Sequence, residues 1–252
     1  AIDAGAKQVH EVEVPDSWKS CEDEGLFAPE VKGGKEDVVD FVKNIQAKVN
    51  AQEGNTLPVS AFNDYVDGST PSGSSAYEKR GIAVDIPVWV EENCIQCNRC
   101  AYVCPHAVIR PVALTEDELA KAPEGTKAID MIGMPGMKFA ITVSALDCTG
   151  CGSCANVCPG KKGEKALVMK NMEENVASQN VFDFGREIEV KPEVVAKFKP
   201  ETVKGSQFKQ PLLEFSGACA GCGETPYAKL ITQLFGDRMY IANATGCSSI
   251  WG

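Results

Sequence analysis

Two copies of one cysteine motif constrain this chain more than any other feature. Each copy reads C-x2-C-x2-C-x3-C-P, and the copies begin at Cys94 and Cys148. All four cysteines recur at a constant offset of 54 positions, as from Cys94 to Cys148. A short apolar run precedes each copy, at 86–90 and at 139–146, and we predict both runs as strands. The sequence therefore predicts a strand followed by a cysteine loop, twice.

This spacing is typical of iron–sulfur binding. Three closely spaced thiolates can hold three corners of a [4Fe–4S] cube, while the fourth cysteine, turned away by the proline, reaches the other cube. The motif thus predicts two clusters with crossed ligands. The first set is Cys94, Cys97, Cys100 and Cys158, and the second is Cys148, Cys151, Cys154 and Cys104.

Zinc and disulfides are the alternatives. C-x2-C pairs also hold structural zinc, but zinc does not call for three evenly spaced cysteines plus a fourth before proline, twice over. Disulfide scaffolds are small, secreted and poor in core, whereas this chain has 252 residues, 44% of them hydrophobic. We therefore rank both below iron–sulfur clusters.

Charge and hydropathy exclude several classes of partner. The chain has 35 acidic and 25 basic residues, which argues against a nucleic-acid-binding surface. No stretch approaches the roughly 20 apolar residues that a bilayer crossing needs, and Ala1 opens no basic and then apolar leader. We expect a soluble, unexported, cytoplasmic protein with neither a nucleic-acid nor a membrane partner.

Outside the motifs, periodicity predicts a few elements. Residues 35–50 have apolar residues on one helix face, 67–75 read as a loop, and the proline-punctuated stretch 191–211 reads as a connection without a long helix or central strand. A helix is predicted from a Thr225 cap to Gly236, and a buried strand over 238–242. The predicted apolar positions are Val38, Val42, Ile45 and Val49 in the first helix, and Tyr227, Leu230, Ile231 and Leu234 in the second.

A third cysteine group consists of Cys219, Cys222 and Cys247. Three cysteines are one short of the four that hold a cubane, and a C-x2-C pair alone can equally be redox-active or zinc-binding. Glycines beside the pair let backbone approach a cluster or cofactor closely. These residues alone do not identify a ligand.

The arrangement of these motifs resembles known families. Residues 82–175 resemble the bacterial two-cluster ferredoxins, with a long insertion, because 43 residues separate Cys104 from Cys148. The segments 217–226 and 244–251 and the Tyr-Glu-Lys-Arg-Gly stretch at 77–81 occur in the same order as in the single-chain pyruvate members of the 2-oxoacid:ferredoxin oxidoreductase family. That resemblance covers nearly the whole chain.

The resemblance implies an activity and its cofactors. These enzymes oxidatively decarboxylate pyruvate with coenzyme A, giving acetyl-CoA and carbon dioxide, and pass electrons through [4Fe–4S] clusters to ferredoxin or flavodoxin. Cys219, Cys222 and Cys247 match three ligands of a third cluster, and Glu224 and Cys247 match positions that line thiamine diphosphate. The fourth ligand of that cluster and the Mg²⁺ and diphosphate residues are expected outside this chain, which reads as a middle segment of a homodimeric enzyme.

We therefore expect an α+β chain with four parts: the tail of a preceding domain at 1–34, a small linker domain at 35–81, a two-cluster ferredoxin-type domain with an insertion at 82–192, and the start of an α/β thiamine-binding domain at 193–252. The alternative function is a stand-alone two-cluster electron carrier, which leaves the third cysteine group and residues 77–81 without a purpose. A zinc-stabilised scaffold is a further alternative.

Other residues receive plainer interpretations. We expect His106 to make a hydrogen bond near a cluster, and Cys21 to be an ordinary thiol. Methionines at 131, 134 and 137 should serve local packing. Four lysines follow the second motif: Lys161, Lys162, Lys165 and Lys170. We expect them to be solvated surface residues, and the alternative is that they form a docking face for an acidic electron carrier.

Overall fold

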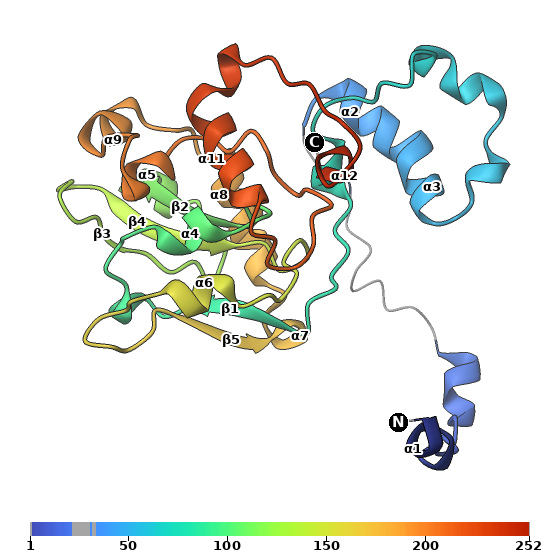
Figure 1. Ribbon diagram of the computed structural model, residues 1–252. Helices are drawn as coiled ribbons and strands as arrows, with labels where there is room; N and C mark the ends of the chain where they lie inside the picture. The colour runs from blue at the N-terminus through green and yellow to red at the C-terminus, as the bar shows by residue number, and fades with distance from the viewer. Residues whose placement is uncertain (1, 22–30, 32–33, 252) are drawn as a thin grey trace.

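Two small antiparallel sheets form the centre of the computed structural model, which describes residues 2–21, 31 and 34–251. In one sheet, β1 (Asp85–Trp89) pairs with β5 (Leu167–Asn171). In the other, the strand order is β2 (Ile109–Leu114), β4 (Lys138–Val143) and β3 (Ile129–Asp130). The predicted strands at 86–90 and 139–146 are thus present, and each ends shortly before a cysteine motif, although they lie in different sheets (Figure 1).

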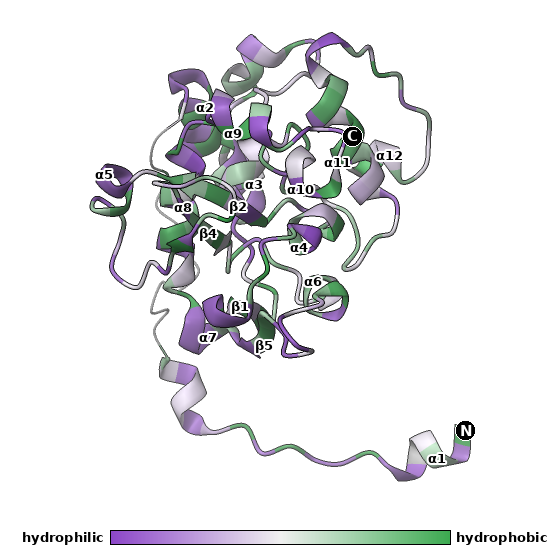
Figure 2. Ribbon diagram, turned by 90° about the vertical axis from the view of Figure 1, so that its left-hand side faces the viewer, coloured by the Kyte–Doolittle hydropathy of each residue, from purple (hydrophilic) through white to green (hydrophobic). Residues whose placement is uncertain are grey.

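The long insertion between the motifs builds the second sheet. Residues 105–147 supply all of β2, β3 and β4 together with α5 (Glu116–Leu119), whose first turn is closed by a capping box between Thr115 and Glu118. Strand β4 is apolar (Figure 2), and Phe139 within it is fully buried. The insertion is therefore a structured part of the core.

Short helices cover the sheets. Helix α8 (Ser178–Glu187) contacts β4 at Gly185, where an added Cβ would lie 3.0 Å from Thr142 Cγ2, so the missing side chain lets the helix pack close to the sheet. The other helices of this region are α4 (Arg99–Val103), α6 (Ser153–Val157) and α7 (Met172–Asn175).

The segment after residue 191 packs onto this core. It forms α9 (Pro192–Lys197) and α10 (Val203–Ser206), and it buries Val194 and Phe208. The ring of Phe208 meets Phe139 edge-on, with centroids 6.4 Å apart. The expectation of no long helix or central strand is confirmed, but the segment packs as part of the core.

The N-terminal part contains a separate small core. After α1 (Ile2–Lys7) and a 3-10 turn (Asp16–Ser20), the predicted helix appears as α2 (Glu36–Phe41), a π-helical turn (Val42–Gln46) and α3 (Ala47–Asn50). The extra residue in a π turn rotates the helix face, so Val38, Val42 and Ile45 are buried while Val49 is 49% exposed. Further 3-10 turns cover Gly54–Thr56, Val59–Tyr65, Ser74–Tyr77, Glu91–Asn93 and Gly236–Arg238.

Helix α11 (Thr225–Phe235) corrects one prediction. It ends at Gly236 as expected, but Glu224 rather than Thr225 is its cap residue, and the face turned inward carries Lys229 and Gln233. Gln233 Nε2 donates to the carbonyl oxygen of Lys209 at 3.0 Å. The core offers carbonyl acceptors to this helix, so its polar face packs inward and Tyr227, on the predicted apolar face, is 68% exposed.

The predicted buried strand at 238–242 is wrong. Residues 239–245 are irregular, and Tyr240 and Ile241 are exposed. A strand needs a hydrogen-bonded neighbour, and no described strand lies alongside these residues. The chain then turns into α12 (Ser248–Trp251). No helix among the described residues has the length and apolar character needed to cross a bilayer.

Candidate iron–sulfur cluster sites

Four cysteines from the two motifs surround one cavity. Cys94, Cys97 and Cys100 of the first motif line it together with Cys158 of the second. Its other walls are mainly apolar and include Trp89. This is the combination of thiols that crossed ligation requires, with three from one motif and the fourth from the other.

The remaining four cysteines form a second group. Burial raises the pKa of both Cys148 and Cys154 to about 12, and the nearby Cys104 adds to the rise at both. Cys151, which is exposed, also lies close enough to raise both of these pKa values. Cys104 therefore lies with the second motif, although it belongs to the first.

The two groups are neighbours. Helix α4 carries Cys100 and helix α6 carries Cys154, and the two helices pack together. Burial raises the pKa of Cys100 well above its ordinary value, and among its neighbouring cysteines Cys154 contributes most. Among the described residues, no three Cys, His, Asp or Glu side chains are arranged to hold a single metal ion.

The two cysteine loops share one backbone shape, built from different residues. The residues that flank the middle cysteine have positive φ angles in both copies: Gln96 (56°) and Asn98 (59°) in the first, Gly150 (69°) and Gly152 (72°) in the second. Glycine adopts this region without strain, whereas other residues pay a conformational cost. The first loop therefore needs compensating contacts.

Side-chain hydrogen bonds supply that compensation. Gln96 Nε2 donates to the carbonyl of Asp130 at 2.7 Å, and its Oε1 accepts from the backbone N–H of Ile132 at 2.8 Å. Asn98 Nδ2 donates to the carbonyl of Lys204 at 2.9 Å. The first loop is thus held by the insertion on one side and by α10 on the other. Sequence reasoning missed both residues, and the available signal was their register with the glycines of the second copy.

Backbone N–H groups point at the sulfur atoms. Gln96 N donates to Cys94 Sγ and Gly150 N donates to Cys148 Sγ, each at 3.4 Å, so the repeat extends to this contact. Ala166 N donates to Cys158 Sγ at the same distance. Hydrogen bonds to sulfur are one of the means by which proteins set the potential of a cluster.

The Glu-Lys-Arg segment at 78–80 contacts the start of the second motif. Lys79 Nζ lies 2.5 Å from Asp147 Oδ2, directly before Cys148, and both side chains are buried. Ser144 Oγ donates to the same carboxylate oxygen at 2.6 Å. The Lys79 ammonium also lies 4.8 Å from the ring centroid of Phe215. This segment therefore joins the linker region, the second motif and the approach to the third cysteine group.

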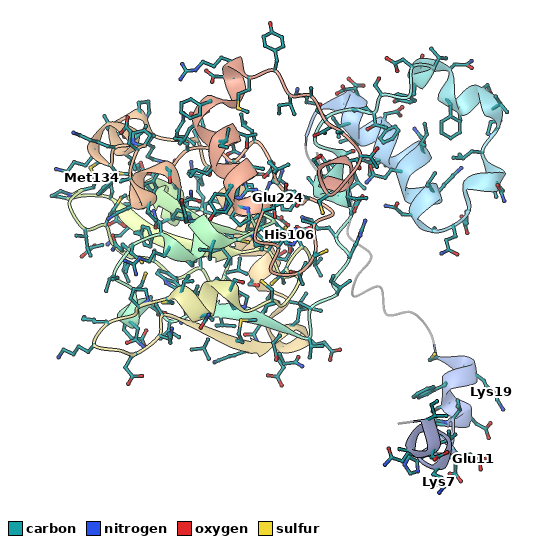
Figure 3. All side chains as sticks on the ribbon, viewed as in Figure 1. Lys7, Glu11, Lys19, His106, Met134 and Glu224 are labelled. Carbon is teal, nitrogen blue, oxygen red and sulfur yellow. The ribbon has the colours of Figure 1, made fainter. Side chains whose placement is uncertain are left out.

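The third cysteine group is mostly exposed. Cys219 and Cys247 are exposed and Cys222 is half-buried, with its backbone N–H bonded to the carbonyl of Cys219 at 3.0 Å. The proximity of Thr225 lowers the pKa of Cys222. Glu224 is exposed at the start of α11 (Figure 3). The structure brings the C-x2-C pair together, and it does not bring Cys247 into a metal-binding group with it among the described residues.

The turn between Cys219 and Cys222 contacts the second motif. Gly221, with φ +67°, lies against this motif so closely that an added Cβ would be 3.4 Å from Cys151 Cβ. His106 makes a second link, because its Nδ1 lies 3.0 Å from the carbonyl oxygen of Ser216. The third group is therefore adjacent to the group formed by Cys104 and the second motif.

The plainer predictions are largely confirmed. His106 makes its hydrogen bond two residues after Cys104, and Met131 is buried in the core with Met134 and Met137 packed beside it. Of the lysines after the second motif, Lys165 is used internally, since its Nζ donates to the carbonyl of Cys158 at 2.7 Å. The other three, Lys161, Lys162 and Lys170, are exposed. Cys21 is exposed, and its thiol donates to the carbonyl oxygen of Trp18.

Two family models match the chain. Residues 29–83 match one described as a domain of unknown function, and residues 93–162 match a 4Fe-4S dicluster domain. The second match covers all eight motif cysteines, and with the mixed helices and strands it makes this region an α+β ferredoxin-like module with [4Fe–4S] clusters.

Curated relatives match over the whole chain. The pyruvate:ferredoxin oxidoreductase of Moorella thermoacetica is 54% identical over 255 residues, and the pyruvate-flavodoxin oxidoreductase of Enterobacter agglomerans is 51% identical over 252 residues. The pyruvate dehydrogenase [NADP(+)] of Cryptosporidium parvum is 51% identical over 86% of this chain. The chain spans 21%, 20% and 11% of these proteins, respectively. Along its full length, therefore, the chain is similar to one segment of the pyruvate:ferredoxin and pyruvate-flavodoxin oxidoreductases.

Proposed function

We propose that this chain is the electron-transfer segment of a pyruvate:ferredoxin or pyruvate:flavodoxin oxidoreductase. The single observation that carries the proposal is the cavity lined by three cysteines of the first motif and by Cys158 of the second. A crossed set of this kind is what a two-cluster ferredoxin module needs. A stand-alone carrier would share this feature but not the similarity that extends over the entire chain.

The proposed ligands follow the two groups of thiols. Cys94, Cys97, Cys100 and Cys158 hold one [4Fe–4S] cluster, and Cys148, Cys151, Cys154 and Cys104 hold the other. The donor set fits, because each group provides four sulfur donors, and burial keeps thiols such as Cys148 protonated until iron displaces the proton. When bound, the clusters supply one-electron acceptance at potentials set by sulfur hydrogen bonds and solvent exclusion.

We assign a third cluster to Cys219, Cys222 and Cys247, with its fourth ligand outside this chain. The contact of Gly221 with Cys151 supports this, because it places the third group next to the second motif. The three groups then form a row in the order third group, second motif, first motif. Glu224 and Cys247 are proposed to line thiamine diphosphate, whose Mg²⁺ ligands lie elsewhere. Thiamine supplies carbanion stabilisation for the decarboxylation.

The domain division follows from the same reading. We propose a tail of a preceding domain at 1–34, a linker domain at 35–81, the two-cluster module at 82–192 and the start of the thiamine-binding domain at 193–252. The separate core of α2, which includes Val38, supports the second of these, and the contacts of α10 and α11 with α4 support a close association of the last two.

The substrates and partners belong to the whole enzyme. We propose pyruvate and coenzyme A as substrates, ferredoxin or flavodoxin as electron acceptor, a homodimer, and the reducing cytoplasm of an anaerobic microbe. The exposed Lys161 and Lys162 follow Cys158 closely, so they are the proposed docking site for an acidic carrier at the end of the row.

Iron analysis of the anaerobically reconstituted chain tests the proposal. A two-cluster module binds about eight irons, the enzyme about twelve once the missing ligand is supplied, and a zinc scaffold none. Crossed ligation makes a sharper forecast. A Cys97→Ser, Cys158→Ser double variant should lose about four irons, because both residues serve one cluster, and Cys151→Ser with Cys158→Ser should lose about eight. Cys21→Ser is the control without loss, and the opposite pattern in the two double variants would refute the assignment.

A further inference from the structure

Lys229 is a buried cation that forms no ion pair with a carboxylate among the residues that the structure describes. Its side chain projects from α11 into the core, and the residue is 1% exposed. The ammonium donates to the carbonyl oxygens of Ala101 and Cys104, the latter at 2.9 Å. Among the described residues its titratable neighbours are Cys104, Cys100, Arg110 and His106. Of these four, only the two cysteines can carry a negative charge.

Burying an uncompensated ammonium costs free energy, because water is replaced by a medium of low polarity. Here the cost is opposed by the two carbonyl dipoles, and the nearby Arg110 is itself paired with Glu214, so that ion pair supplies no countercharge to Lys229. A [4Fe–4S] cluster with four thiolate ligands is anionic, and each reduction adds a negative charge. Loading the two sites would give Lys229 the countercharge that the protein side chains lack.

The position of Lys229 concerns both sites. Cys104, whose carbonyl it binds, is assigned to the cluster of the second motif, and Cys100 to that of the first. The residue also belongs to the helix that starts shortly after the Cys219 and Cys222 pair, and it lies seven residues beyond Cys222. This position explains why α11 packs through its polar face, because that packing places the Lys229 ammonium between the two sites.

Resting on the proposed ligand sets, we propose that Lys229 is the internal countercharge of the two clusters, a positioning residue that favours their reduced states and fixes the helix of the third cysteine group on the module. A fixed positive charge favours the state with more negative charge, so removing it lowers the reduction potential. Burial makes the effect of the Lys229 charge on the reduction potential large, since water and salt screen a buried charge far less than an exposed one.

The test is a potentiometric titration of the anaerobically loaded full chain, followed by electron paramagnetic resonance, with iron content measured on the same samples. We expect Lys229→Met and Lys229→Gln to lower the equilibrium constant of at least one reduction step tenfold or more, which is 59 mV for one electron. The two variants separate charge from hydrogen bonding, because the amide of glutamine still has N–H donors. Lys229→Arg should stay within threefold of the parent.

Lys121→Met is the matched control, since it removes an exposed lysine of the insertion, away from the cysteine motifs, and it should change the constant less than twofold. Loaded Lys229→Met and Lys229→Gln proteins with parental potentials would overturn the proposal. If neither loads iron but Lys229→Arg loads fully, the charge is required for assembly, which supports it. If none of the three loads, Lys229 acts through shape and the proposal fails. Failure of the unmodified chain to bind iron would instead refute the proposed function.

Discussion

Removing the buried ion pair between Lys79 and Asp147 should destabilise the fold strongly. The two side chains are 9% and 6% exposed, and among the described residues Asp147 keeps its hydrogen bonds with Ser144 once the lysine is gone. Breaking a buried pair by deleting one partner costs about 3–5 kcal/mol, because the other charge stays buried. We expect Lys79→Met to lower the free energy of unfolding by that amount. With a slope of roughly 2–3 kcal/mol/M, the urea midpoint falls by about 1–2.5 M.

The neighbouring residue provides the matched control. Arg80 forms an ion pair with Glu78 at 2.6 Å, but its side chain is 64% exposed, so Arg80→Met should cost less than about 1 kcal/mol. Urea unfolding of the metal-free chain, followed by circular dichroism, measures both variants. Adding Asp147→Asn to Lys79→Met should restore part of the loss, since no unpaired charge remains buried. Equal costs for Lys79→Met and Arg80→Met would refute the reasoning.

Three further predictions concern the cysteine sites. Gly150→Ala should lower the free energy of unfolding more than Gly152→Ala does. Both positions have positive φ, which costs alanine about 1–2 kcal/mol, but of the two only Gly150 would bring a Cβ within 3.1 Å of a backbone oxygen. Equal urea midpoints for the two variants would contradict this. The affinity of the chain for iron should rise as pH rises from about 6.5 to 8.5, because buried thiols with a pKa of about 12, such as Cys148, must release protons to bind iron. An iron titration whose midpoint does not depend on pH would contradict this prediction. Lys161→Gln with Lys162→Gln should slow reduction of an acidic carrier at low salt, with little change at high salt.

The last of these has its own control. Lys43 is exposed on the π-helical turn of the N-terminal unit, and it lies outside the cysteine-rich module. Lys43→Gln removes one charge there and should leave the reduction rate unchanged. Stopped-flow reduction of ferredoxin or flavodoxin by the whole enzyme gives the rates. Unchanged rates for the Lys161, Lys162 double variant at low salt would remove the docking site.

The cysteine pattern predicted the centre of the molecule well, because spacing alone restricts what closely placed thiols can bind. The crossed grouping of Cys104 and Cys158 was readable from the motif, and the structure places each beside the opposite motif. The contribution of Gln96 and Asn98 could not be predicted from the motif, because no local sequence pattern indicates that a non-glycine residue has a positive φ angle. Their bonds reach Asp130 and Lys204, and contacts over such separations leave no periodic trace.

Predictions that depended on which face meets which neighbour fared worse. Hydrophobic periodicity located α11, but it assigned Tyr227 and Ile231 to the buried face, and the module instead offers carbonyl acceptors that suit Lys229. The predicted strand at 238–242 was wrong because a strand is defined by its partner. Val49 left its predicted face because a π turn changes the helical phase, which a fixed period cannot represent.

The different build of the two cysteine loops has a consequence for synthesis. The glycines of the second loop permit its shape without strain, so no later segment is needed to offset a backbone cost there. The first loop cannot be completed until much later, because Gln96 must await Ile132 and Asn98 must await Lys204. The loop that is translated first is therefore the last to be locked, and until then its thiols have a less rigid frame in which to receive iron.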